Sequence, residues 1–405
     1  MLHNMKLILI VFIFECGVCF SQTKNDSVKF DSIDPSIFIN RLSTHPFGIF
    51  ISRINHNFQV APAKKTSFSF NISNGNVWLP NVKAYFPLSE TDRYAMRKIV
   101  WHERGGYFDA ENTPSQTMEF HADAIIRLYQ LKLNIPLSIK SELSIASRAF
   151  SVDAGNVPFS LFTSDQFIEW YHSNLSRFED PFARRVYGFD KVKIHYTDKN
   201  GKEIELKNGD FVFSGIEMSY HYYPAFKRLE KNKIYTNFGL QLGFNTTRIN
   251  PSADLGFSAS AIKQFNLKTR RQIHFGISAA ALRQKLISFG EGVQLSNTRY
   301  LLSAEFLLDY VIPLKRNSCL SIATTYFIQS SYNKKSESDY YVLTGERIST
   351  HWNYSISHLY RVLTANYFSI AFSKGAFAVS VYAREDLLVD NAPDVQTGIG
   401  FKMSF

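Results

Sequence analysis

The sequence predicts an all-β fold, a transmembrane antiparallel up-and-down β-barrel of about twelve strands. Apolar and polar residues alternate in segments of about ten residues, as in strands with one face in lipid and the other in a polar lumen. Aromatic residues make up 15% of the chain, with 36 Phe and 21 Tyr, although the mean hydropathy is only -0.15. A helical membrane protein is excluded because no apolar run approaches the ~20 residues that a spanning helix needs.

Residues 1–21 have the pattern of a secretory signal peptide. Lys6 supplies the positive charge, Leu7–Phe14 form the apolar core, and small residues precede a cut ahead of Gln22. A lipid anchor on one of the two leader cysteines is disfavoured because neither cysteine follows a small residue. Cys319 is the only cysteine that remains after cleavage, so no intramolecular disulfide is expected.

After the leader, residues 22–45 are expected to form a periplasmic or lumenal segment and residues 46–405 the barrel. Two large excursions interrupt the strands, at 74–117 and at 151–209. The formal net charge of +10 comes without a clustered Lys/Arg run, so no nucleic acid partner is expected. Anionic lipid heads and small solutes are the expected partners instead.

A further alternating piece, Phe47–Asn57, either joins the wall, which with another strand would make fourteen strands, or lies in the lumen. Within Met118–Ile135 the apolar residues change parity, which predicts a β-bulge near Leu128. From Ser349 to Phe372 the parity never changes, which predicts one long strand. The expected strands are 67–72, 118–135, 139–150, 211–223, 234–247, 255–267, 273–281, 300–312, 320–328, 349–372, 376–386 and 394–405.

Long and short connections alternate between these strands. In the second excursion, Thr163–Phe178 has helical spacing and Ile194–Leu206 has the pattern of a β-hairpin. If Phe405 ends in the periplasm, short turns fall on the periplasmic side and long loops outside, as such barrels require. The turns are then 268–271, 313–317 and 374–375, and the loops are 284–297, 332–348 and 387–393.

The last strand, Asp394–Phe405, resembles the final strand of Gram-negative outer-membrane β-barrels, which commonly end on a Phe. That resemblance implies a place in the cell outer membrane, among its lipids and lipopolysaccharide, and recognition of Phe405 by the barrel-assembly machinery. A second resemblance covers most of the mature chain and implies a barrel but no activity. It is to an uncharacterised outer-membrane family known only as a domain of unknown function, through Asn134–Leu137, Ile168–His172, Arg177 and Arg184–Arg185.

One short motif is a candidate for catalysis. His172, Ser173 and Asn174 are similar to the His-x-Ser-Asn segment of outer-membrane phospholipase A, in which a His takes the proton of the Ser. Here His and Ser are adjacent on an expected helix and therefore point about 100° apart, which disfavours a catalytic pair. The favoured alternative is a packed loop helix beside a loop cluster of Arg177, Asp180, Arg184 and Arg185.

Ionisable residues inside a membrane barrel are candidates for function. On the assigned parities, a cluster of charged residues is expected to face the lumen from three consecutive strands. Because both signs of charge are present, a paired network that braces the barrel is favoured over a substrate or gating site. The cluster consists of Glu119, His121, Asp123, Lys140, Glu142, Arg148, Glu217 and His221.

The sequence has no metal-binding motif, phosphate loop or nucleotide fingerprint, so no cofactor and no metal are expected. The predicted function is passive passage of small solutes through an outer-membrane barrel. The alternatives are a lipid-active hydrolase and a structural or surface-binding barrel without a pore.

Overall fold

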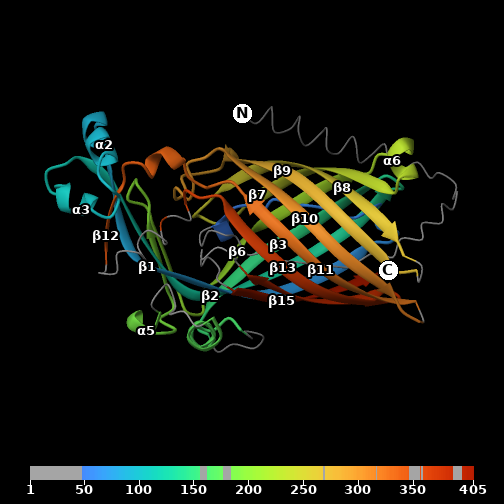
Figure 1. Ribbon diagram of the computed structural model, residues 1–405. Coiled ribbons are helices and arrows are strands. Elements are labelled where there is room, and N and C mark those ends of the chain that lie inside the picture. The colour runs from blue at the N-terminus through green and yellow to red at the C-terminus, as the bar shows by residue number, and fades with distance from the viewer. Residues whose placement is uncertain are drawn as a thin grey trace.

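The computed structural model describes residues 48–155, 162–176, 184–267, 270–315, 317–345, 356, 359–385 and 395–405. The predicted leader and the segment 22–45 lie outside the described residues. In the described part of the chain, 12 strands form a closed antiparallel barrel, because β1 pairs with the last strand, β15, as well as with β2 (Figure 1). The predicted fold class is therefore confirmed.

The barrel strands match the expected segments in number and order, with differences at their ends. They are β1 (Ser67–Pro87), β2 (Ser115–Ser138), β3 (Ser141–Asp153), β6 (Phe211–Tyr222), β7 (Ile234–Asn245), β8 (Ser252–Asn266), β9 (Gln272–Ser288), β10 (Tyr300–Pro313), β11 (Ser318–Gln329), β13 (Leu363–Lys374), β14 (Phe377–Glu385) and β15 (Val395–Ser404).

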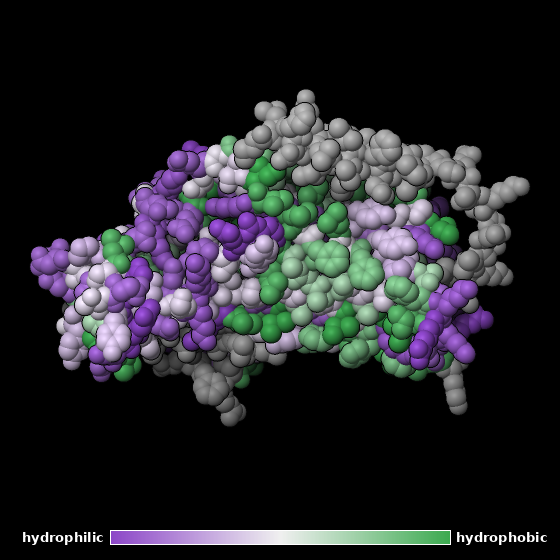
Figure 2. Space-filling model, turned by 90° about the horizontal axis from the view of Figure 1, so that it is seen from above, coloured by the Kyte–Doolittle hydropathy of each residue, from purple (hydrophilic) through white to green (hydrophobic). Residues whose placement is uncertain are grey.

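The two faces of the barrel wall differ as the alternation predicts. On β7, Phe238 and Leu240 are exposed, whereas Asn237 and Gln241 on the opposite face are buried. The same alternation recurs on β8, β9, β10, β11, β13 and β14. On the face seen in Figure 2, apolar residues gather over the barrel and hydrophilic residues gather at both of its ends. An apolar belt between polar rims suits a lipid bilayer.

The connections differ between the two ends of the barrel. Short turns at 139–140 and 375–376 lie at the end that holds Phe405, together with α6 (Lys227–Lys231), and we call it the turn end (Figure 1). The opposite end, which we call the loop end, holds α2 (Glu90–Arg97), α3 (Arg104–Tyr107), the connection 289–299 and the described residues 330–341 and 359–362.

At the loop end, β1 and β2 continue past the barrel as a two-stranded arm. Two further strands widen it: β12 (Val342–Gly345) pairs with β1, and β4 (Lys193–Thr197) pairs with β2 and with β5 (Glu203–Lys207). The predicted hairpin is therefore confirmed as β4–β5. The excursion predicted at 74–117 is confined to 88–114, because the β1–β2 ladder runs on to the pair Pro87–Ser115.

The β-bulge predicted near Leu128 is wrong. The strands β1 and β2 pair without a break from Ser67–Asn134 to Leu79–Ala122. The register of β2 does not change. The apolar residues change parity because in the barrel wall the outer face of β2 is apolar, whereas in the arm its inner face packs on an apolar core. Leu131 lies on the outer face and is 46% exposed, whereas Phe120 faces the opposite way and is fully buried in an apolar core.

The long strand predicted from Ser349 to Phe372 is also wrong at its start. Its described part begins with Ile356, which is helical, and with a turn at 359–361, and β13 starts only at Leu363. Residues 346–355 and 357–358 lie outside the described residues. Ile356 and Tyr360 keep the strand-like apolar pattern because both are buried in the core at the loop end.

We call that apolar core the loop core. It joins the inner face of the β1–β2 arm to η1 (Gly48–Phe50), the β4–β5 hairpin and the long connections. Phe50 and Phe150 meet edge to face, with their ring centroids 5.4 Å apart. Burial of apolar surface holds the connections over this end of the barrel. Members of the loop core include Ile49, Phe50, Val77, Leu79, Phe120, Ile126, Phe150, Ile194, Leu295, Tyr332, Val342, Ile356 and Leu359.

The helices of the described chain are short and lie outside the strand ladder. Besides those already named, they are α4 (Asp165–Tyr171), which runs on into the π-helical segment His172–Ser176, and α5 (Arg184–Tyr187). The helix predicted at 163–178 is thus present over 165–176. Among the described residues, none of these helices has the length and apolar content to cross a bilayer.

Candidate functional site

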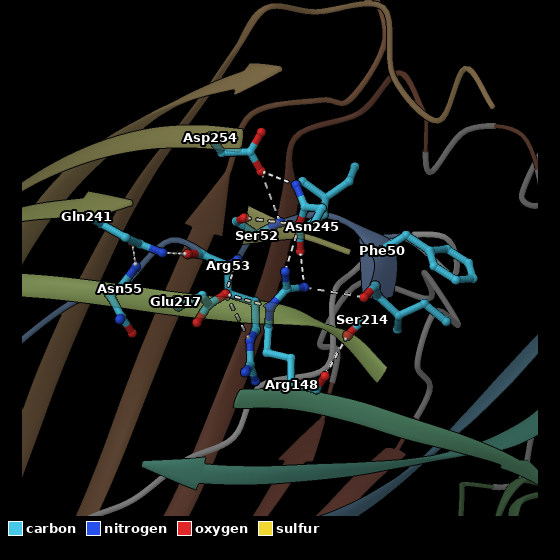
Figure 3. Close-up of polar contacts among 12 residues, drawn as sticks. Phe50, Ser52, Arg53, Asn55, Arg148, Ser214, Glu217, Gln241, Asn245 and Asp254 are labelled. Carbon is cyan, nitrogen blue, oxygen red and sulfur yellow. Dashed lines mark hydrogen bonds and ion pairs between the residues drawn. The ribbon is translucent and has the colours of Figure 1, made fainter. Parts of the chain in front are cut away.

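The lumen contains a segment of the chain itself. Residues 48–63, which we call the plug, start in the loop core at η1 and continue inside the barrel without joining a strand ladder. Figure 3 shows this segment passing the inner faces of several wall strands. Of the two alternatives for Phe47–Asn57, the lumenal one is confirmed for residues 48–57.

Arg148 on β3 connects the plug to two wall strands. Its Nε lies 3.0 Å from a carboxylate oxygen of Glu217 on β6, and one terminal nitrogen donates to the Asn245 side chain of β7 at 2.6 Å. The other terminal nitrogen donates to the carbonyls of Ile49 and Ile51, at 3.4 and 2.8 Å. Both Arg148 and Glu217 are buried, so each charge is neutralised by the other (Figure 3).

The wall also binds the plug backbone. Glu217 accepts the Arg53 amide at 2.7 Å, and Asp254 accepts the Ser52 amide at 3.3 Å. Gln241 accepts the Asn55 amide at 3.1 Å and donates to the Arg53 carbonyl. These wall groups satisfy plug amides that no strand ladder pairs, and an unpaired buried amide would be costly.

Farther along the plug, three more wall groups continue this pattern. Asn237 on β7 donates to the carbonyls of Asn57 and Gln59, at 3.0 and 3.1 Å. The His56 ring hydrogen-bonds the hydroxyls of Ser278 on β9 and Ser303 on β10, at 2.7 and 2.8 Å. The plug is therefore tied to the wall along its length rather than at one point.

Glu142 on β3 receives the last part of the plug. Its carboxylate accepts the Ala63 amide at 3.1 Å and the Asn57 side chain at 3.3 Å. The Tyr223 hydroxyl donates to the same carboxylate at 2.7 Å. In this way Glu142 fixes the plug near the turn end as Arg148 fixes it near the loop end.

Small residues in the wall leave room for the plug. A Cβ on Gly243 would lie 1.9 Å from the Ser52 hydroxyl, and one on Gly276 would lie 2.5 Å from the Phe58 ring. Both glycines are on the inner face, where the sequence shows many small residues. The gap between Asn55 and the wall residues Ser219 and His221 has no room for a water molecule.

A β-bulge does occur, on β6 next to Arg148. The register between β3 and β6 shifts there, so that Arg148 pairs with Gly215 and Ala149 with Phe213. Gly215 has φ +153°, and a Cβ on it would lie 2.1 Å from the Phe244 carbonyl and 2.8 Å from the Arg148 guanidinium. Only glycine at position 215 leaves space for the Arg148 side chain to pass over β6 on the inner face of the wall.

The predicted lumen cluster is only partly brought together. Glu142, Arg148, Glu217 and His221 are buried and face the lumen, and the first three hold the plug. Lys140 is exposed in the turn between β2 and β3.

Glu119, His121 and Asp123 face away from the lumen, because β2 has no bulge that would turn them inward. Glu119 instead meets Lys83 on the arm, with its oxygen 3.0 Å from the Lys83 nitrogen. His121 and Asp123 pair across the ladder with His195 and Lys193 of β4.

The loop cluster is structural where it is described. Arg184 is fully buried on α5, with its Nε 3.5 Å from Asp165 of α4 and its terminal nitrogen 3.3 Å from Asn76 of β1. It thereby fastens the second excursion to the outer face of the arm. The exposed Arg185 lies 3.5 Å from Glu169, and Arg177 and Asp180 lie outside the described residues.

The motif His172-Ser173-Asn174 lies on the π-helical segment that follows α4. The Ser173 hydroxyl donates to the Glu169 carboxylate at 3.1 Å, and the Asn174 side chain donates to the Trp170 carbonyl at 2.8 Å. These are contacts one helical turn apart, as expected for the packed loop helix. The Ser173 hydroxyl and the Asn174 amide therefore form hydrogen bonds within the helix.

Several plug-binding residues were missed by sequence analysis. Gln241 and Asn245 lie on the inner parity of a strand that was assigned correctly, so alternation alone could have placed them in the lumen. Asp254 was missed because the predicted strand began at 255, whereas β8 begins at Ser252. The position of Arg53 could not be predicted, because the sequence around it does not show which wall strands the plug passes.

Together, the fold and the site define a transmembrane β-barrel whose lumen is occupied by its own N-terminal segment. No family model matches the chain, and no curated protein matches it. Among solved structures, it is similar to an outer-membrane channel from Pseudomonas putida F1, at 7% identity and a TM-score of 0.40, over 87% of this chain and 100% of that one.

Two further structures are similar over much of their length. The NanC porin has 8% identity and a TM-score of 0.34, with 69% of this chain and 93% of the porin covered. The β domain of the Bordetella autotransporter BrkA has 7% identity and a TM-score of 0.33, with 84% and 99% covered. These scores are low, and the barrel is established by its own strand pairing.

Proposed function

We propose that the protein is an outer-membrane barrel that is closed at rest by its plug, and that small solutes pass only when the plug moves. The single observation that carries this proposal is the set of bonds between wall and plug, from Asp254 and Arg148 near the loop end to Glu142 near the turn end. A lumen lined by polar groups is suited to water and solutes, whereas here the groups bind a peptide segment.

The bonds also suggest how the plug could move. They join polar groups to a segment without regular secondary structure, and water could replace each bond at a small net cost, about 1 kcal/mol. The apolar anchor at η1 would remain in the loop core while the polar part shifts. Passage would therefore require breaking wall contacts and would leave the barrel itself intact.

Single-channel recording in planar bilayers tests this proposal. The wild-type protein should stay closed for most of the record. The double variant Asn237→Ala/Gln241→Ala removes two amides that hold the plug backbone, so its open probability should rise several-fold. The folded state is checked by the heat-modifiable band on a gel.

The control variant is Gln264→Ala, which removes a lumenal amide that bonds the wall residue Gln272. It should behave like the wild type, because this hydrogen bond joins two wall strands and does not hold the plug. A wild-type barrel that conducts continuously, or equal open probability in all three proteins, would contradict a plug that closes the lumen.

A further inference from the structure

A pocket of about 720 Å³ lies at the loop end, outside the barrel. It is formed between the α2–α3 segment and the connection that carries η3 (Lys335–Glu337). Its volume is within the range of ligand sites, about 300 to 1,000 Å³. None of its lining residues belongs to the plug, so its function is independent of the proposed gating.

Arg104 joins the two walls of this pocket. Its Nε donates to the carbonyl of Ile99 at 3.0 Å, on its own side of the pocket. Its terminal nitrogens donate to the carbonyls of Ser338, Asp339 and Tyr341 on the opposite side, at 3.2, 2.6 and 2.8 Å. Because Arg104 is buried and its donors are used in this way, the pocket is formed before any ligand arrives.

A second set of contacts fixes the aromatic wall. The rings of Tyr341 and Tyr360 stack with centroids 5.7 Å apart, and the Tyr360 hydroxyl donates to Glu337 at 3.1 Å. Lys199, from the β4–β5 hairpin, lies 2.8 Å from the same carboxylate. Burial raises the pKa of Tyr341 to about 12, so its ring stays neutral at physiological pH.

The lining is strongly basic. Among the described lining residues, five are Arg or Lys, and Asp339 is the only acidic one. Lys98, Lys335 and Arg361 are exposed, and within the described chain no carboxylate lies at ion-pair distance from any of them. Their charges are therefore available to an anionic ligand.

Aromatic side chains lie among these cations. Trp101, which is partly exposed, lines the pocket, and the buried rings of Tyr341 and Tyr360 form part of its other wall. Aromatic rings supply flat apolar area with a polar edge, against which a ring-shaped ligand can pack. Cations alone would suit any small anion, whereas cations and aromatic rings together suit an anion with a ring body.

We propose that this pocket binds an acidic saccharide. The anionic groups of the saccharide lie against Lys98, Lys335 and Arg361, and one of its sugar rings packs on Trp101. The site gives the loop end a binding activity that does not depend on the lumen.

The proposal is tested by titration calorimetry of the full-length folded protein in detergent with an oligogalacturonate as the probe. The wild type should bind it, and binding should weaken as salt is added. The variant Lys98→Gln/Lys335→Gln/Arg361→Gln should bind about tenfold more weakly, because three exposed cations that face the anionic groups of the probe are removed. Trp101→Phe should weaken binding of the same probe while the cations remain.

The matched control is Lys227→Gln/Arg228→Gln/Lys231→Gln on α6, which removes the same charges from exposed positions at the turn end. It should bind like the wild type. A neutral maltooligosaccharide and inorganic phosphate are the comparison ligands, and both should bind more weakly than the oligogalacturonate. Equal loss in both triple variants, or equal affinity for phosphate alone, would overturn an acidic saccharide site.

Discussion

At the scale of single residues, Arg148 joins the plug to three wall strands, β3, β6 and β7. It neutralises Glu217, bonds Asn245 and holds two plug carbonyls, all without access to solvent. A buried ion pair adds little stability by itself, but losing one partner leaves an uncompensated charge. These contacts fit the favoured interpretation, in which paired charges brace the barrel. The same contacts also hold the plug.

Replacing Arg148 should accordingly destabilise the barrel. We expect Arg148→Met to lower the free energy of unfolding by about 3 kcal/mol, because the buried Glu217 would keep only Arg53, whose Nε lies 3.8 Å away, as a charged partner. The double variant Arg148→Met/Glu217→Leu should lose less, since the buried carboxylate is removed as well and the charge that remains, on Arg53, is partly exposed. Urea unfolding followed by gel mobility measures both, and a double variant as unstable as the single one would contradict this account.

The charged residues of the predicted lumen cluster were only partly placed correctly from the sequence. The inner parity of β3 and β6 placed Glu142, Arg148 and Glu217 correctly, because a strand turns alternate side chains to one face. The same rule misplaced Glu119, His121 and Asp123, because it was combined with a bulge inferred from apolar parity. Apolar residues mark burial as well as lipid, and on the β1–β2 arm they face the loop core.

At the scale of elements, the wall strands, the helix in the second excursion and the β4–β5 hairpin were predictable, whereas the plug and β12 were not. Twelve segments alternate because each wall strand has lipid on one side, and that local rule needs no knowledge of neighbours. The plug and the strand β12 are decided by distant partners: β12 pairs with β1, more than two hundred residues earlier in the chain. Ile356 and Tyr360 follow a strand-like alternation in sequence because both are buried against distant parts of the loop core.

The depth of a strand residue in the bilayer gives a test of the outer face. Leu240→Arg puts a charge near the middle of β7 on its exposed face and should cost about 2 to 4 kcal/mol. Ile234→Arg lies on the same face at the end of the strand, near the membrane surface, and should cost about 0 to 1 kcal/mol. Unfolding in urea from lipid vesicles compares them, and equal losses would mean that this face does not lie in lipid.

At the scale of the whole molecule, the barrel separates two ends of different kind. The turn end has short turns and Phe405, whose amide bonds the Thr66 carbonyl at 2.9 Å. The loop end has the arm, the loop core and the acidic-saccharide pocket. A barrel with its long connections outside the cell would present that pocket to the surroundings.

Labelling of whole cells tests this orientation. In a Cys319→Ser background, Ser336→Cys on the exposed η3 should react with a membrane-impermeant thiol reagent. Lys374→Cys at the turn end should react only after the cells are opened. The reverse pattern would show that the loop end faces the periplasm.

The position of the plug is the central claim, and short-range cross-linking tests it most directly. In the Cys319→Ser background, Asn55→Cys changes the plug and Ser219→Cys changes β6. The Asn55 amide nitrogen and the Ser219 hydroxyl oxygen lie 3.1 Å apart. A short bis-thiol reagent should join the two cysteines, change the gel mobility of the folded barrel and keep it closed in planar bilayers. The control pairs Asn55→Cys with Ser369→Cys on β13, six strands from β6 around the barrel, and should not cross-link. Absence of cross-linking in the first pair, or equal cross-linking in both, would contradict a plug bound to the wall at β6.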